Sequence, residues 1–405
     1  MDHERLAELV IGEYVGLPLK FRLKPTEWTV LAAIVAYDSS LDEYRLISMS
    51  TGTKCNGFSS SPVDPYSVRD CHAEAICRRG LLVVLWKDVL NLSDDDDDST
   101  GVLLVATTEK ESNKESTKKR SKRLSFSLKP TLTLHLFISD LPCGSASEFG
   151  RVSGESTRVT GAKLIASSLL SLRTKPGRSD LPPDKQTRCM SCSDKVVKWT
   201  SQCGIQGALL HQAGLSVSIA SVVLSRDAML SALESPQRAT QPELDEEQSA
   251  REVVSESMRL CLLRLPENLT QVYVSKLHSF PQSRQRICPP QRLNSSKGSP
   301  SGACLSWICV PNGRRVKANA GYVEMLVGMR GVREGAMKTA SSAAVASDLC
   351  KASLFQFYRQ FDDGGREISY LAAKQAAREY AAIRSSFLER FPEWNVNQVW
   401  DDFVL

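Results

Sequence analysis

The spacing of apolar residues changes along the chain and predicts both strands and helices. Residues 26–37 and 43–52 are rich in β-branched and aromatic side chains and flank a short polar turn, which indicates a β-hairpin. Residues 71–86 follow an N-cap candidate, Asp70, and predict a helix whose second half is largely apolar. Further strands are expected at 101–108, 131–139 and 215–225, and further helices at 4–15 and 191–199. Strands that alternate with helices favour an α/β or α+β layered domain.

The last third of the chain has the character of helices, and polar segments separate several of the expected elements. Residues 348–361 and 368–391 both carry apolar side chains at helical spacing. Other segments are charged or polar and poor in aromatic residues, as is typical of insertions that lack a packed core. We therefore predict a single domain over residues 1–405 that carries disordered insertions at 93–125, 234–257 and 290–302.

The composition is that of an ordinary globular protein, with 42% hydrophobic and 24% charged residues among 405. The longest apolar runs are too short to span a bilayer, and the acidic N-terminus lacks the basic and apolar regions of a secretory signal. We therefore expect a cytoplasmic or nuclear protein, whose twelve cysteines are reduced thiols or metal ligands. The net charge of +5 permits a polyanionic partner without requiring one.

Histidine and cysteine residues at the boundaries of the expected elements suggest a catalytic zinc site. His72 and Glu74 form an H-x-E pair at the start of a helix, and Cys143 follows a proline at the end of a strand. Zinc deaminases combine His and Cys ligands with a glutamate that moves protons without binding the metal. The C-x-x-C pattern expected after the proline is not completed, so Cys189 or Cys192 would supply the third ligand. Spacing alone leaves that choice open, and a free cysteine is often simply a buried core residue.

Three longer motifs resemble the catalytic domain of the adenosine deaminases acting on RNA: DCHAEAICRRGLL, SDLPCGSASEF and SCSDKVVKWTSQCGIQGALL. No double-stranded-RNA-binding domain precedes them, so the chain is most similar to the tRNA-specific branch of that family. The resemblance runs from about residue 10 to the C-terminus. It implies a cytidine-deaminase-like zinc core, in which helices flank a mixed sheet, followed by a helical C-terminal extension.

The resemblance implies a role for each candidate residue. It assigns the zinc ligands to His72, Cys143 and Cys192, and the proton shuttle to Glu74. The implied reaction is hydrolytic deamination of adenosine to inosine in tRNA, at the adenosine just 3′ of the alanine tRNA anticodon. In such a reaction a zinc-activated water attacks C6 of an adenine that is unstacked from its neighbours. The expected partner is tRNA, and no membrane, DNA or obligate protein partner is indicated.

Two adjacent arginines, Arg78 and Arg79, interrupt the apolar stretch of the helix that begins near residue 71. Buried guanidinium groups are unfavourable unless an anion compensates them, and no acidic cluster of the sequence obviously does so. The family buries inositol hexakisphosphate, and the resemblance assigns to it the two arginines and a further set of residues. That set is Lys175, Lys195, Lys198, Trp199, Gln206, Lys351, Tyr370, Lys374, Tyr380 and Arg384.

The C-terminal part of this set can be interpreted in a second way. Lys374, Tyr380 and Arg384 would lie on neighbouring faces of one helix, which suits a polyphosphate but also suits a solvated face with snorkelling side chains. The chain departs from the family near its C-terminus. After Trp400 the family continues with an acidic residue and a lysine, whereas Phe403 stands at the lysine position here, which removes one cation.

Two other functions remain as alternatives to a tRNA adenosine deaminase. A non-catalytic RNA-binding zinc protein would not need Glu74, which is present. A deaminase of other RNA remains an alternative, whereas a deaminase of free nucleosides is disfavoured by the incomplete C-x-x-C pattern and by the long C-terminal region. An assay of ammonia release from free nucleosides separates the last possibility from the first.

Overall fold

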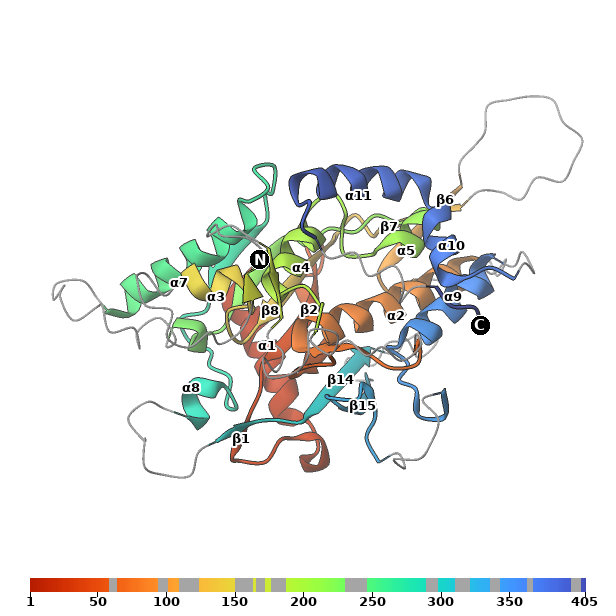
Figure 1. The fold of residues 1–405 in the computed structure, drawn as a ribbon. Coiled ribbons are helices and arrows are strands. Elements are labelled where there is room, and N and C mark those ends of the chain that lie inside the picture. The colour runs from red at the N-terminus through yellow and green to blue at the C-terminus, as the bar shows by residue number, and fades with distance from the viewer. Residues whose placement is uncertain are drawn as a thin grey trace, which may run out of the picture.

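The computed structural model describes most of the 405 residues (Figure 1). The described residues are 1–57, 64–93, 101–108, 124–149, 163–164, 172–175, 187–229, 246–288, 298–309, 321–335, 343–362, 367–394 and 402–405. Within them, no helix combines the length and the apolar character that a bilayer-spanning segment needs.

A mixed eight-stranded sheet forms the centre of the molecule, in the order β12-β11-β8-β2-β3-β14-β15-β16. Strands β8, β11 and β12 are parallel to one another, and every other neighbouring pair is antiparallel. The strands are β2 (Leu31–Asp38), β3 (Glu43–Thr51), β8 (Leu132–Ile138), β11 (Ser221–Leu224), β12 (Gln271–Val274), β14 (Ala303–Cys309), β15 (Gly321–Val327) and β16 (Val332–Arg333). The predicted hairpin is β2–β3, and the predicted layered α/β architecture is confirmed.

The two faces of β2 bury alternate side chains in two separate hydrophobic clusters. Ala32 and Ile34 face a large cluster that contains α2 (Ala73–Ser93), whereas Leu31, Ala33 and Val35 face a smaller one that contains α1 (His3–Gly16). This period-2 alternation places one helix layer on each face of the sheet. Strands covered on both faces read as continuous apolar runs, which is why the sequence of β2 shows no polar alternation.

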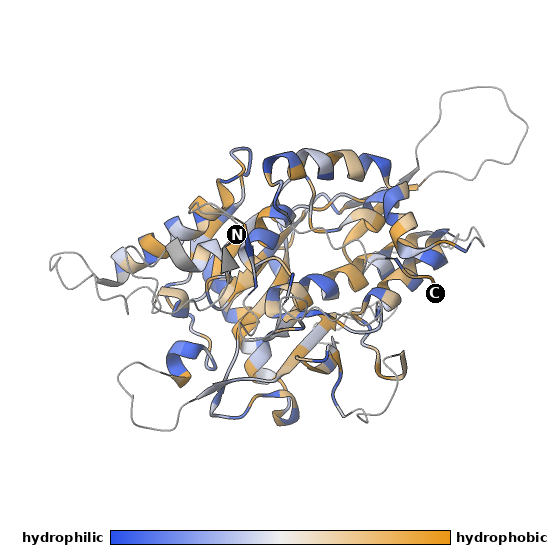
Figure 2. Cartoon of the chain, viewed as in Figure 1, coloured by the Kyte–Doolittle hydropathy of each residue, from blue (hydrophilic) through white to orange (hydrophobic). Residues whose placement is uncertain are grey.

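Helix α2 crosses the sheet in close contact with it, and Figure 2 shows how largely hydrophobic this helix is. A Cβ atom at Gly80 would lie 2.9 Å from the Cβ of Ser48 in β3, so the glycine permits the close approach. The helix begins at Ala73, directly after β5 (Asp70–His72). Asp70 therefore lies in a strand and is not the N-cap that the sequence suggested, although its Oδ1 accepts the His72 N–H at 3.1 Å.

Among the described residues, four two-stranded ladders accompany the central sheet. Strand β5 pairs with β4, β1 with β13, β6 with β7, and β9 with β10. Their bounds are β1 (Glu27–Trp28), β4 (Thr53–Cys55), β6 (Leu104–Thr108), β7 (Leu124–Leu128), β9 (Lys163–Leu164), β10 (Arg173–Thr174) and β13 (Ser299–Pro300). The antiparallel β4–β5 ladder, in which Thr53 is the partner of His72, fixes the segment that carries the candidate metal ligand.

The C-terminal region is helical, as predicted, but the helix expected over 368–391 is interrupted. Ala377 has a ψ of 69°, which ends α10 (Tyr370–Ala376), and α11 (Arg378–Arg390) continues in a new direction (Figure 1). Lys374 and Arg384 therefore lie on two helices and not on one. The other helices are η1 (Leu19–Phe21), α3 (Ser145–Phe149), α4 (Cys192–Thr200), α5 (Ala208–Gln212), α7 (Glu246–Leu262), α8 (Arg284–Ile287), η5 (Ala343–Val345) and α9 (Lys351–Asp362).

Parts of the three predicted insertions have regular structure. Helix α7 begins within 234–257, strands β6 and β7 reach into 93–125, and β13 lies within 290–302. Ala250, Val254 and Met258 of α7 are fully buried at four-residue spacing. That narrow apolar stripe is hidden among charged residues, which explains why the composition of the segment suggested a linker. Much of the remainder of these ranges lies outside the described residues.

A buried carboxylate in the C-terminal half of α2 binds the backbone of residues 102–104. Substitution of this carboxylate therefore tests the fold. Asp88 is fully buried and accepts the backbone N–H groups of Val102, Leu103 and Leu104 at 2.9, 2.6 and 3.1 Å. Asp88→Ala leaves three donors without this acceptor, so we expect the free energy of unfolding to fall by about 3 kcal/mol in denaturant titrations. Asp88→Asn, which keeps one acceptor oxygen, should lose roughly 1 kcal/mol. Equal losses for both variants would contradict this anchoring role.

Candidate metal and catalytic centre

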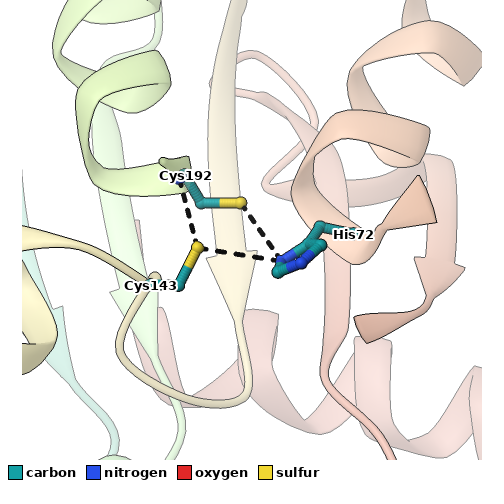
Figure 3. Close-up of side chains that lie close together, drawn as sticks. All are labelled: His72, Cys143 and Cys192. Atoms are coloured by element: carbon teal, nitrogen blue, oxygen red, sulfur yellow. Dashed lines mark hydrogen bonds between the residues drawn. The ribbon is translucent and has the colours of Figure 1, made fainter. Parts of the chain in front are cut away.

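Three side chains from separate elements converge at one end of the central sheet (Figure 3). His72 ends β5, Cys143 lies in the loop that follows β8, and Cys192 is the first residue of α4. His72 Nδ1 lies 3.8 Å from Cys143 Sγ and 3.7 Å from Cys192 Sγ. Their ligand atoms all lie within 4.8 Å of one another. A tetrahedral zinc with bonds of about 2.0–2.3 Å separates its ligand atoms by about 3.5–3.8 Å, so this donor set fits zinc.

The sequence around Cys143 and Cys192 explains how they meet. Gly144 has a φ of 116°, and a Cβ atom there would lie 2.3 Å from Ser191 Oγ, so the P-C-G turn requires its glycine. The Ser193 N–H donates to the Cys143 carbonyl at 3.0 Å, and the Ser193 hydroxyl donates to the Pro142 carbonyl at 2.9 Å. The loop is therefore fastened directly to the first turn of α4.

Glu74 lies in the first turn of α2, two residues after His72, and is 2% exposed. Its Oε2 atom is buried and makes no hydrogen bond within the part of the chain that the structure describes. A buried carboxylate oxygen without a partner is unfavourable in a resting fold, so such an atom indicates a group that acts on a ligand. Glu74 is not among the three clustered donors, as expected of a proton-transfer group.

A network of charges lies directly behind the candidate ligands. Lys175 is fully buried, and its Nζ donates to Asp70 Oδ1 at 2.8 Å and to Cys192 Sγ at 3.1 Å. Lys195, one turn along α4, forms a second ion pair with Asp70. Burial alone would lower the pKa of Lys175, but the negative charges of Asp70, Cys192 and Cys143 outweigh it and raise that pKa well above its usual value. Both lysines thus stay charged beside the sulfur ligands.

The same charges act on Cys143. Its pKa is held well below the ordinary thiol value, chiefly by the hydrogen bond with Cys192 and also by the charges of Lys175 and His72. A thiolate is the form that binds zinc. The sequence assigned Lys175 and Lys195 to a polyphosphate and gave Asp70 no role beyond capping. Only the fold shows that Asp70 holds both lysines next to Cys192.

One further polar group near the ligands escaped the sequence analysis, and the alternative third ligand lies apart from them. The Thr53 hydroxyl oxygen, on the residue that pairs with His72, is buried and makes no hydrogen bond to a described residue. Cys189, the alternative third ligand, lies outside the ligand cluster and contacts Cys55 of β4. A lone threonine in a T-G-T-K segment carries no sequence signal of chemistry, so only the β4–β5 register could reveal it.

Basic side chains of α2, α4, α10 and α11 form a second group, the cation cluster, defined as Arg78, Lys198, Lys374 and Arg384. Burial lowers the pKa of Lys198 to about 7, and the positive charges of the other three members also act to lower it. Burial likewise lowers the pKa of Arg78 to about 10. Among the described residues, no carboxylate forms an ion pair with Arg78, Lys198 or Arg384. The cluster therefore has the charge and the partial burial of an anion site.

Aromatic rings line the cation cluster. The Arg78 guanidinium lies 5.7 Å from the centre of the Trp199 ring, and burial raises the pKa of the Tyr380 hydroxyl to about 12. The ammonium groups of Lys351 and Lys374 lie 6.0 and 5.3 Å from the Tyr370 ring. Phe403, at the position where a lysine was expected, stacks on the same ring at 5.1 Å.

Two residues assigned to the polyphosphate make structural contacts. Gln206 is buried, donates to the Cys203 carbonyl at 3.2 Å and accepts the Val217 N–H at 3.0 Å. Arg79 donates to the Leu349 carbonyl at 2.6 Å, next to the start of α9. These bonds join the α4–α5 segment and the C-terminal helices to the rest of the domain.

The sequence is similar to adenosine deaminases named for tRNA and for double-stranded RNA. The tRNA-specific adenosine deaminase 1 of Drosophila melanogaster is 31% identical over 227 residues, which are 51% of this chain and 50% of that protein. The double-stranded RNA-specific adenosine deaminase of Rattus norvegicus is 26% identical over 243 residues, 55% of this chain and 19% of that protein. The chain spans about half the length of the tRNA-specific relatives it matches.

A solved structure of Aspergillus oryzae Rib2 deaminase covers 70% of this chain and 94% of its own, with 11% identity and a TM-score of 0.26. That likeness is too low to carry an argument. The family profile described as the adenosine-deaminase (editase) domain instead matches residues 48–398, which include all three motifs that suggested this family. The match extends over most of the chain, and the chain therefore belongs to the adenosine-deaminase (editase) domain family.

Proposed function

We propose that this protein is a hydrolytic deaminase that converts adenosine to inosine in tRNA. The observation that carries the proposal is the convergence of His72, Cys143 and Cys192 beside the unpartnered Oε2 of Glu74, in a chain of the editase family. Several similar proteins are named tRNA-specific adenosine deaminase 1, which supports tRNA as the substrate class. The adenosine 3′ of the alanine tRNA anticodon is the proposed target.

Zinc is the proposed metal, held by His72, Cys143 and Cys192. One histidine and two thiolates leave a fourth position of a tetrahedral site open, as catalytic zinc sites require. Bound zinc would supply Lewis-acid activation of water for the hydrolysis. Lys175 supports this ligand set, because its ammonium group lies 3.1 Å from Cys192 Sγ and offsets part of the negative charge of the thiolates.

Glu74 is the group that moves protons in the proposed reaction. Its Oε2 takes a proton from the attacking water and then delivers protons to the ring nitrogen and to the leaving amino group. The C6–N bond breaks, ammonia leaves and a C6 carbonyl remains, so the atoms of adenosine and water balance. The burial of Glu74 keeps bulk water from exchanging these protons during the reaction.

An adenine inside a helical stack cannot present its C6 to this centre. A base that is to react must be unstacked, and a loop nucleotide needs the least energy to reach that state. The anticodon loop meets this requirement. The net charge of +5 favours association with the polyanionic tRNA backbone.

The cation cluster is the proposed site of inositol hexakisphosphate. Burial and the positive charges of Arg384, Arg78 and Lys374 lower the pKa of Lys198 to about 7, so a polyanion would return it to the charged form. Trp199, Lys351, Tyr370 and Tyr380 border the same site, whereas Lys175 and Lys195 already pair with Asp70. The anion would join α2 and α4 to α10 and α11.

A first test concerns the metal. We expect the purified protein to contain one zinc per chain, and we expect Cys192→Ala to lose it, because two ligands bind zinc too weakly. Cys189→Ala is the matched control, since its thiol lies outside the ligand cluster. Elemental analysis of both variants measures the outcome. Retention of zinc by Cys192→Ala and its loss from Cys189→Ala would reverse the assignment.

A second test concerns catalysis. Glu74→Gln keeps the volume of the side chain but cannot shuttle a proton, so inosine formation should fall by at least about 10²-fold. Zinc content, thermal unfolding and tRNA affinity should stay unchanged, as they should in the exposed control Glu379→Gln, which also keeps its activity. Sequencing of tRNA after incubation detects inosine as an A-to-G change.

The same experiment separates the alternatives. Wild-type rates from Glu74→Gln would exclude the proposed mechanism, and loss of zinc would make Glu74 a metal ligand or a structural residue. Release of ammonia from free adenosine, without A-to-G changes in tRNA, would identify a nucleoside deaminase. Changes confined to the anticodon loop of alanine tRNA would support the finer proposal.

A third test concerns the anion. Acid-denatured protein should release one molecule of inositol hexakisphosphate per chain, measured by anion chromatography with mass spectrometry. Arg384→Gln should lower both the anion content and the melting temperature, because it removes a cation of the cluster. Arg390→Gln on the same helix is the matched control, since Arg390 pairs with exposed Glu267 and such pairs contribute at most about 1 kcal/mol. Protein that is fully stable and free of any inositol phosphate would contradict the proposal.

A further inference from the structure

Two cysteines that take no part in the proposed metal site lie together beside it. Cys55 ends β4, and Cys189 lies three residues before Cys192. Both are partly exposed, and the His72–Cys143–Cys192 cluster contains neither. Each thiol lies close enough to the other to shift its pKa.

Thr187 fixes the relative position of the pair. Its hydroxyl lies 3.3 Å from Cys55 Sγ and accepts the backbone N–H of Cys189 at 3.2 Å. The carbonyl of Cys189 accepts the Lys175 N–H at 2.7 Å, and the side chain of Lys175 reaches Asp70, the β5 partner of Cys55. Cys55 is thus connected to Asp70, and Cys189 to Lys175, the two residues of one buried ion pair.

The surroundings of the two thiols are unequal. The pKa of Cys189 is lowered to about 6, chiefly by the hydrogen bond with Cys55 and also by the positive charge of Lys195. The pKa of Cys55 is raised well above its usual value by the same hydrogen bond and by burial. The pair therefore combines one thiol that ionises more readily than usual with one that ionises less readily. A thiolate and a thiol are the two forms that disulfide formation by an oxidant requires.

We propose that Cys55 and Cys189 are an oxidation site at which a hydroperoxide converts the thiol pair into a disulfide. The Cys189 thiolate attacks one oxygen of hydrogen peroxide, the O–O bond breaks, and the hydroxide that leaves takes a proton from solvent. Cys189 becomes a sulfenic acid. Cys55 sulfur then attacks the Cys189 sulfur, the S–O bond breaks, and the hydroxide that leaves takes the Cys55 proton as water. Two electrons leave the sulfur pair, and peroxide is reduced to two molecules of water.

The disulfide would join the two segments that carry metal ligands without using a ligand. Strand β4 pairs with the strand that ends in His72, and Cys189 directly precedes the turn that leads to Cys192. Because neither sulfur belongs to the cluster, the metal should remain bound after oxidation. Retention of metal distinguishes this site from oxidation of Cys143 or Cys192, which would release it.

The test uses the purified full chain with its bound metal and hydrogen peroxide at about equimolar concentration. Free thiols are blocked with iodoacetamide, and tryptic peptides are analysed by mass spectrometry for a Cys55–Cys189 link. Cys55→Ser should stop the reaction at a sulfenic acid on Cys189, which a cyclic dione traps. Cys189→Ser should show neither product. Cys288→Ser, which removes another partly exposed thiol, should react as the wild type does.

The expected result is one intramolecular Cys55–Cys189 disulfide in the wild type, complete loss of that disulfide in each of the two variants of the pair, and unchanged zinc content. A disulfide that involves Cys143 or Cys192, with release of zinc, would overturn the proposal. A wild type in which Cys55 and Cys189 both remain alkylated by iodoacetamide after peroxide treatment would also overturn it.

Discussion

The geometry of the candidate centre depends on one buried carboxylate. Asp70 accepts ion pairs from Lys175 and Lys195, and Lys175 in turn contacts Cys192. A buried ammonium group without a counter-charge would lose its proton, and it could then no longer offset the charge of a thiolate. Burial opposes ionisation of Asp70, but the two lysines outweigh it and hold the pKa of Asp70 far below its usual value. The carboxylate thus keeps both lysines charged next to the sulfur ligands.

The parts of this centre that the sequence predicts are those that lie close together along the chain. The H-x-E pair predicts that Glu74 reaches the neighbourhood of His72 without joining the ligands, because two residues separate them at the start of a helix. The role of Asp70 depends instead on Lys175, which is about a hundred residues away and reaches it only through the fold. The choice between Cys189 and Cys192 likewise depends on the fold, because the spacing along the chain does not show which sulfur points toward His72.

In the fold, too, features set by neighbouring residues are predictable from the sequence, whereas features set by contacts between distant residues are not. The continuous apolar run of β2 predicts a central strand, and the structure places it between two hydrophobic clusters. The break at Ala377 is not visible in the sequence, because alanine is a strong helix former and the residues on both sides keep helical spacing. Both helices nevertheless pack against α5. Lys374 and Arg384 consequently lie on different helices, and the positive charge of each acts on Lys198.

Two groups of buried or partly buried cations in this domain are compensated in different ways. Lys175 and Lys195 have an internal acid, whereas no described carboxylate pairs with Arg78, Lys198 or Arg384. Mutual repulsion in the second group is relieved in part by the lowered pKa of Lys198. Phe403 also limits this repulsion. Its ring stacks on Tyr370 at a position where a lysine would have added another positive charge. A polyanion bound as proposed above would offset the remaining repulsion between helices that already contribute side chains to the core.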